Sequence, residues 1–164
     1  MKQSLLGIFL LCTMNVFSQN IKIGYINSLE LVSIMPETKA ADSAVLKLAQ
    51  ELDAVYKEYI KEYQTKYVKL NDASISEEMK GTISQDLQYL ETRIKDYEQT
   101  SQDKVNNKRA ELYQPILEKA TKAVQATAKE NGYTHVLDSS NGVIIYAPEG
   151  DNILALVKKK LNIK

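Results

Sequence analysis

Hydrophobic residues recur at steps of three and four over the 95 residues from Glu37 to Asn131. This stretch holds one glycine, Gly81, and one proline, Pro115. In its first half the repeating positions are Ala41, Val45, Leu48, Leu52, Val55, Tyr59, Tyr63, Tyr67 and Leu70. In its second half they are Met79, Ile83, Leu87, Leu90, Ile94 and Tyr97. A repeat of about 3.5 residues predicts two helices that pack together as a coiled coil.

The repeat stops after its first half, where a short run of small and polar residues intervenes. Ser74, with Glu77 three residues later, fits a capping box for the second helix, and Ser76 is an alternative N-cap. The first helix is predicted over residues 37–70 and the second over residues 76–114. Two helices of similar length with a short connection predict an antiparallel hairpin.

The second helix loses its apolar stripe toward its end. Ser101, Lys104 and Lys108 interrupt the stripe, which predicts a looser and more mobile seam in this part of the hairpin. Pro115 predicts a kink or a break, because proline removes a helical hydrogen bond and clashes with the preceding turn. Residues 116–131 then continue as a helix that ends at an Asn-Gly pair.

The two ends of the chain have a different pattern. Residues 21–26 alternate as a strand does, and residues 133–137 and 142–147 are rich in Val, Ile and Tyr, with a hairpin turn between them. Asp151 is predicted to cap a last helix. The fold class is therefore α+β, mostly α. Three strands are close to the minimum for a stable sheet, so we expect this small body to assemble with copies of itself.

The first eighteen residues are typical of a cleaved signal peptide. Lys2 precedes an apolar run, and Ser18 is a small residue at the predicted cleavage site. The run is too short to span a bilayer, which needs about 20 residues. The predicted mature chain has 146 residues, no cysteine and a net charge of −1. We therefore expect an exported protein that is not stably inserted in a membrane.

Composition excludes several classes of site. The chain has 21 basic and 21 acidic residues, so no strong field favours nucleic acid. A single cysteine and a single histidine exclude a disulfide framework and a multi-histidine zinc site. The histidine, His135, lies in a predicted strand without a nucleophile motif nearby. The sequence therefore predicts no enzyme, catalytic residue, metal or cofactor.

Three blocks of the sequence resemble the Skp/OmpH family of periplasmic chaperones, in the form found in Bacteroidetes-type bacteria. They are KIGYINSLELVSIMPETKAA, LYQPILEKATKAVQATAKENGYTHVLDSSNGVIIYA and GDNILALVKKKL. The resemblance implies one domain over residues 19–164, with a body from residues 19–36 and 115–164 and a helical tentacle over residues 37–114. It also implies a jellyfish-like homotrimer around a central β-barrel. The strand residues expected to build that trimer body are Ile21, Ile23, Tyr25, Val143 and Ile145.

The resemblance further implies an ATP-independent holdase in the periplasm, which keeps unfolded outer-membrane β-barrel proteins from aggregating in a cavity between the tentacles before their insertion. The best-known members are strongly basic, with positive tentacle tips, but residues 37–114 here hold 12 basic and 15 acidic residues. Client holding should therefore rest on apolar and aromatic contacts. The candidate client-binding residues are Tyr56, Tyr63, Tyr67 and Met79.

An exported coiled-coil scaffold that binds one folded envelope partner is the alternative. Such a scaffold should carry one apolar docking patch, whereas a holdase should carry a diffuse lining.

Overall fold

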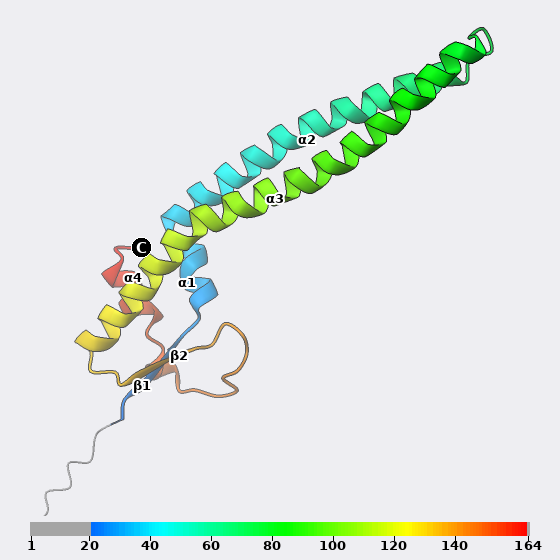
Figure 1. Ribbon diagram of the computed structural model, residues 1–164. Helices are drawn as coiled ribbons and strands as arrows, with labels where there is room; N and C mark the ends of the chain where they lie inside the picture. The colour runs from blue at the N-terminus through cyan, green and yellow to red at the C-terminus, as the bar shows by residue number, and fades with distance from the viewer. Residues whose placement is uncertain (1–20, 164) are drawn as a thin grey trace, which may run out of the picture.

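The computed structural model describes residues 21–163, so the predicted signal peptide at residues 1–18 lies outside the described residues (Figure 1). Two long helices form a hairpin that projects from a small body. The elements in chain order are β1 (Ile23–Ile26), α1 (Ser28–Ile34), α2 (Pro36–Leu70), α3 (Glu77–Glu130), β2 (His135–Asp138), the short 3-10 helix η1 (Glu149–Asp151) and α4 (Leu154–Lys160). The body consists of the short elements together with the C-terminal end of α3.

The predicted antiparallel hairpin is present as α2 and α3. Of the two N-caps considered for the second helix, the structure has Ser76, whose hydroxyl accepts a hydrogen bond from the Met79 N–H. Ser74 instead donates from its N–H and its hydroxyl to the Asp72 carboxylate. The Asp72 carboxylate therefore orders the turn, and the helix begins after it.

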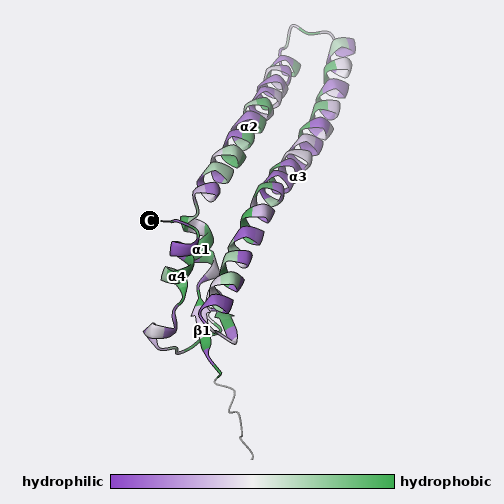
Figure 2. Cartoon of the chain, turned by 90° about the vertical axis from the view of Figure 1, so that its left-hand side faces the viewer, coloured by the Kyte–Doolittle hydropathy of each residue, from purple (hydrophilic) through white to green (hydrophobic). Residues whose placement is uncertain are grey.

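The seam between the arms follows most of the predicted stripe. Along both arms, hydrophobic residues are interspersed among hydrophilic ones (Figure 2). Buried seam positions are Ala41, Val45, Ile83, Leu87 and Leu90. Val55 was predicted to lie in the seam and is instead exposed, while its neighbour Tyr56 is half-buried. The steps of four residues along α2 shift the stripe by one position here, as a stutter does in a coiled coil.

The predicted break at Pro115 is absent, because α3 is one helix of 54 residues that runs from the tip of the hairpin into the body. The proline itself is exposed. The turns that follow it are anchored in the body, where Ile116, Ala120 and Ala123 are buried. This packing offsets the local cost of the missing backbone hydrogen bond.

A short helix that the sequence analysis missed, α1, connects β1 to the hairpin. The Asn27 side chain caps it by accepting the Glu30 N–H at 3.0 Å. Leu31 and Val32 of α1 are buried, and Met35 at its C-cap is fully buried. The Thr38 hydroxyl donates to the Val32 carbonyl, so α1 is fastened to the first turn of α2.

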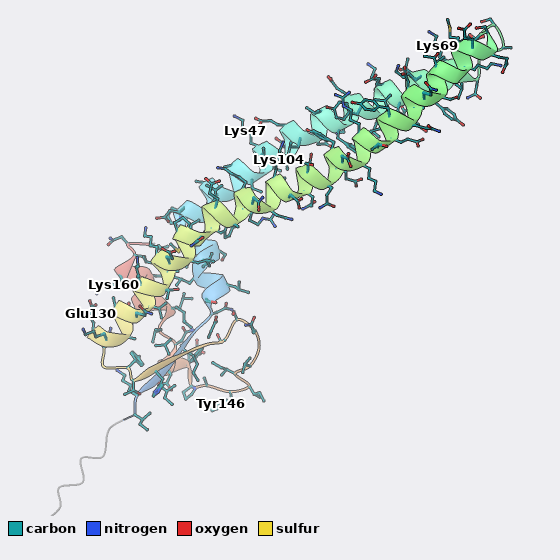
Figure 3. All side chains as sticks on the ribbon, viewed as in Figure 1. Lys47, Lys69, Lys104, Glu130, Tyr146 and Lys160 are labelled. Atoms are coloured by element: carbon teal, nitrogen blue, oxygen red, sulfur yellow. The ribbon has the colours of Figure 1, made fainter. Side chains whose placement is uncertain are left out.

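The C-terminal helix α4 closes the body core. Ile153 and Val157 are fully buried. Asp151 is not the cap that the sequence predicted, because it ends η1 and the N-cap of α4 is Ile153. The Asn152 side chain, one residue earlier, accepts the Leu154 N–H at 3.0 Å. Lys160 of α4 is paired with Glu130 at the end of α3; both are labelled in Figure 3.

The sheet has two strands, not three, in the part of the chain that the structure describes. β1 and β2 pair in parallel, with Ile23 opposite His135 and Ile26 opposite Asp138. The strand and hairpin predicted for residues 142–147 are wrong for the single chain, because this segment is irregular. Its side chains are largely exposed, so β propensity alone does not form a strand without a neighbouring strand to bond.

Candidate functional site

The tyrosines of α2 divide into exposed residues and residues that join the two arms. Tyr59 belongs to the second group. Its ring meets Tyr97 edge-on at 5.2 Å, and the Arg93 guanidinium lies 4.3 Å from its centroid. Arg93 also donates to the Tyr59 hydroxyl at 3.0 Å. These contacts hold α2 against α3, so Tyr59 is a seam residue.

Tyr63 and Tyr67, two of the predicted client-binding residues, stack at a centroid distance of 6.2 Å. The Tyr63 hydroxyl donates to Glu91 Oε1 at 2.7 Å, and this bond to a carboxylate raises the pKa of Tyr63. Tyr67 is 53% exposed. The stack therefore presents one aromatic side chain that is fastened to the other arm and one that is open to solvent.

More exposed apolar surface lies near the tip of the hairpin. Tyr67 and Val68 are near the end of α2, and Met79 is in the first turn of α3; all three are exposed. Tyr89, which the sequence analysis did not single out, is 68% exposed. An ion pair between Lys66 and Asp86, at 2.5 Å, joins the arms in the same region. The tip is thus closed by polar contacts while large apolar side chains remain uncovered.

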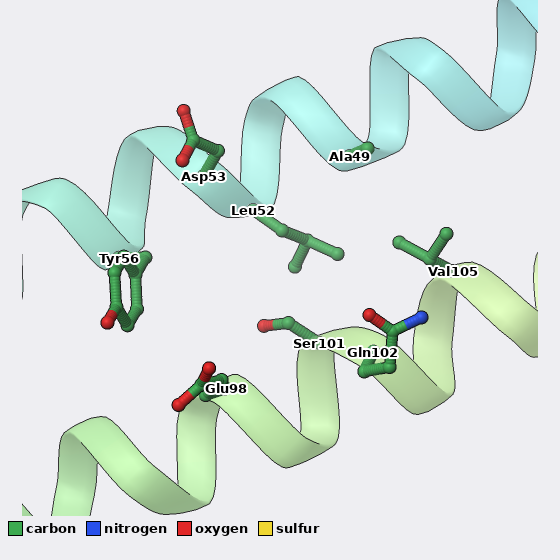
Figure 4. A pocket seen from close by; sticks show the side chains of 8 residues that line it. All are labelled: Ala49, Leu52, Asp53, Tyr56, Glu98, Ser101, Gln102 and Val105. Carbon is green, nitrogen blue, oxygen red and sulfur yellow. The ribbon is translucent and has the colours of Figure 1, made fainter.

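A hollow opens in the seam where the sequence predicted loose packing (Figure 4). This seam hollow has a volume of 330 Å³ and is lined by Ala49, Leu52, Asp53 and Tyr56 of α2 and by Glu98, Ser101, Gln102 and Val105 of α3. Ala49 and Ser101 are small, which leaves the space unfilled. The Ser101 hydroxyl is buried and has no hydrogen-bond partner within residues 21–163. Tyr56, the third predicted tyrosine, therefore lines a hollow and is half-buried.

A hydrogen bond and an ion pair join the two helices at the base of the hairpin. Tyr113 of α3 donates to the Asp42 carboxylate of α2, which raises the pKa of the Tyr113 hydroxyl. Lys119 pairs with Glu37 across the same two helices, and the hydrogen bond from Lys119 lowers the pKa of Glu37. Both contacts lie below the seam hollow, so the arms are joined at the base and thinly packed above it.

The predicted trimer residues of the body have mostly exposed side chains. Val143 is 77% exposed and Ile145 is 99% exposed, and Ile21 and Ile23 are also exposed. Tyr25 is half-buried. The sequence analysis missed Leu137 and Tyr146, which extend this exposed apolar surface along β2 and the following loop; Tyr146 is labelled in Figure 3. The sequence could have identified both residues, since both lie in predicted strands.

Asp138 ties the end of β2 to the start of α1. Its carboxylate accepts the Ser28 N–H at 3.2 Å, the Ser28 hydroxyl at 2.5 Å and the Ser140 N–H at 2.9 Å. Burial raises the pKa of Asp138, but these hydrogen bonds outweigh burial and lower its pKa to about 2. The carboxylate is therefore a structural clasp of the body.

Two further properties are the arrangement of side chains that could bind a metal ion and the apolar character of the helices. Within residues 21–163, His, Cys, Asp and Glu side chains form no group of three or more that could hold a metal ion. His135 is exposed on β2, and its Nδ1 lies 3.1 Å from the Thr134 hydroxyl. None of the helices described by the structure combines the length and the apolar character that a membrane span requires.

Comparison with known proteins places this fold in context. The chain is similar to a protein of Caulobacter crescentus CB15 assigned as an OmpH-like outer membrane chaperone, with a TM-score of 0.72 and 14% sequence identity. The likeness covers 87% of this chain and 84% of that one. No curated protein matches the chain. The family model for outer membrane proteins of the OmpH-like type matches residues 22–161, so the chain belongs to the OmpH-like outer membrane protein family.

Proposed function

We propose that this protein is a holdase chaperone: it is exported to the periplasm, binds unfolded outer-membrane β-barrel proteins and keeps them from aggregating without ATP or a cofactor. Family membership supports a chaperone role. The observation that carries the proposal is the distribution of large exposed apolar side chains along a projecting hairpin, at Tyr67, Val68, Met79 and Tyr89.

Such a surface suits varied unfolded segments. Tyrosine offers a large apolar ring with a polar tip, and methionine adapts to differently shaped partners. Each contact is weak, and many weak contacts at once hold an extended chain without selecting one sequence. The hairpin provides a rigid support because its seam is buried at Ile83, Leu87 and Leu90.

The proposed active form is a homotrimer. Two parallel strands are too few to form a stable sheet by themselves. The body also leaves the side chains of Val143 and Ile145 largely exposed to solvent. Strand residues from three chains would cover these side chains and would supply the neighbours that residues 142–147 lack. Three hairpins around one body would then enclose a space for a client.

The net charge of the hairpin favours binding of clients through apolar contacts over binding through electrostatic attraction. The hairpin, residues 37–114, has a net charge of −3, so it provides no long-range attraction for acidic segments. Apolar burial, in contrast, is nearly insensitive to salt.

A test of the proposal uses a denatured outer-membrane β-barrel protein diluted into buffer with and without the full chain. We expect aggregation, followed by light scattering, to be suppressed at about one trimer per client without ATP. A folded soluble protein serves as the control and should show no binding. If the chain bound one folded envelope protein and left unfolded clients unprotected, the scaffold alternative would replace the holdase.

A further inference from the structure

The seam hollow has a lining that suits one type of side chain. Its walls at Leu52 and Val105 are apolar and half-buried. The lining residues of each arm are spaced by three and four, so they form one continuous face on each helix. In Figure 4 the Leu52 side chain points toward Ser101, and the Glu98 carboxylate points toward the Tyr56 ring. A long, thin side chain could therefore enter between the arms along an apolar wall.

The polar side chains around the hollow are either acidic or uncharged, and no basic side chain is among its eight lining residues. Asp53 is paired with Lys57 at 2.5 Å. Glu98 is exposed and has no ion pair or hydrogen bond to another of residues 21–163. The Ser101 hydroxyl is buried and also has no partner among these residues. A ligand with several hydrogen-bond donors and a positive charge would pair with the Glu98 carboxylate and could bond to the Ser101 hydroxyl. An anionic ligand would instead be repelled by Glu98.

The hairpin already holds one of its own arginines in this way. Arg93 lies 4.3 Å from the centroid of the Tyr59 ring and donates to the Tyr59 hydroxyl. Tyr56 and Glu98 occupy the neighbouring turns of the same two helices. A guanidinium stacks on an aromatic ring and is less strongly hydrated than an ammonium group, so arginine gains more than lysine from a half-buried place of this kind.

From these observations we propose that the seam hollow receives an arginine side chain from an extended segment of an unfolded client. The methylene stem lies along Leu52 and Val105, and the guanidinium meets the Glu98 carboxylate and the Tyr56 ring. The inference rests on the proposed holdase function and adds a preference to it. Among unfolded segments of equal hydrophobicity, those with an arginine inside an apolar run are held more tightly.

The test compares two labelled peptides of an unfolded apolar sequence that differ only at the central residue, which is arginine in one and its uncharged isostere citrulline in the other. Binding to the full chain is followed by fluorescence anisotropy. We expect the arginine peptide to bind about three- to tenfold more tightly, the range of an exposed ion pair combined with a cation–π contact. Glu98→Gln should remove this preference.

Asp96→Asn is the matched control for charge. It also removes one acidic group from α3, but residues two apart lie on different faces of a helix, so the arginine preference should remain. Ser101→Leu provides a second route, because it fills the hollow without changing the charge. This variant should stay folded and lose the preference for arginine.

Equal binding of the two peptides to the unaltered chain would overturn the arginine preference and leave the holdase intact. Persistence of the preference in both Glu98→Gln and Ser101→Leu would also overturn the proposed place of binding. If neither peptide bound and the chain did not suppress client aggregation, both the preference and the holdase function would be wrong.

Discussion

The hydroxyl of Tyr63 on α2 donates a 2.7 Å hydrogen bond to the carboxylate of Glu91 on α3. This bond joins the two arms within the part of the hairpin that we propose contacts clients. It fixes Tyr63 in place, and the Tyr67 ring stacks on it. The aromatic surface is thus partly ordered before any client binds, which lowers the conformational entropy lost on binding.

The first prediction concerns close packing in the body. A Cβ added at Gly24 would lie 2.9 Å from both Ile153 Cγ2 and the Tyr133 ring. We expect Gly24→Ala to lower the free energy of unfolding by about 1–3 kcal/mol, measured by urea unfolding. Gly81→Ala is the control, because among residues 21–163 no atom outside its own stretch of helix backbone lies within 4 Å of the added Cβ. That change should stabilise α3 by about 0.5–1 kcal/mol, since alanine favours a helix interior over glycine. Equal effects at the two glycines would contradict the close packing of Gly24 against Ile153 and Tyr133.

The second prediction concerns acid sensitivity through Asp138. Its pKa is lowered from 3.8 to about 2 in the folded chain, so its contribution to stability is present above pH 4 and is lost as the pH falls toward 2. We expect Asp138→Asn to cost about 1 kcal/mol at pH 6, because solvent partly screens this carboxylate. Unfolding midpoints at pH 6 and at pH 2 measure the difference. A cost that stayed the same at pH 2 would show that the charge of Asp138 does not stabilise the clasp.

The third prediction concerns assembly. Ile145 is 99% exposed in the single chain, so Ile145→Asp should cost little within one chain but should prevent trimer formation if the trimer buries this residue. Light scattering with size-exclusion chromatography reports the mass. Leu46→Asp is the control: Leu46 is also exposed but lies on α2, outside the body, and the trimer should persist. An unaltered chain that is monomeric at micromolar concentration would exclude the trimer.

The helical hairpin could be predicted from the sequence because its signal is local. The spacing of apolar residues and the polar run after Leu70 placed both arms and the turn. Two of the errors share one physical cause, which is that distant contacts decide over local propensity. Pro115 does not break α3 because Ile116 and Ala120 are anchored in the body. Residues 142–147 form no strand because β structure needs a neighbouring strand.

The candidate site was only partly predictable for the same reason. Tyr56, Tyr63 and Tyr67 share one stripe, but the sequence does not show which ring will meet a carboxylate on the other arm. The seam hollow was foreseen as loose packing around Ser101, whereas its partners Ala49 and Leu52 depend on the register of the two helices. That register is a property of the folded hairpin.

The fourth prediction concerns local opening of the hairpin. The seam hollow leaves residues 101–108 thinly packed, so their amide hydrogens should exchange faster than those of residues 83–90, where the seam is buried. Hydrogen exchange with mass spectrometry at neutral pH measures both segments. Residues 143–146, irregular in the single chain, should exchange slowly only when the trimer covers them. Uniform protection along α3 would contradict the predicted opening at the hollow.

The measurement that tests the central claim most directly is suppression of client aggregation, at low salt and with 0.5 M added salt, by the unaltered chain and by a variant with Tyr56, Tyr63 and Tyr67 all changed to Ser. Added salt at this level shortens electrostatic screening to about 4 Å and leaves apolar burial nearly unchanged. We predict that protection by the unaltered chain survives high salt, that the Ser variant protects less while it stays trimeric, and that the matched change to Phe retains protection. Loss of protection in high salt, with no effect of the Ser changes, would show that clients are held by charge and would contradict this account.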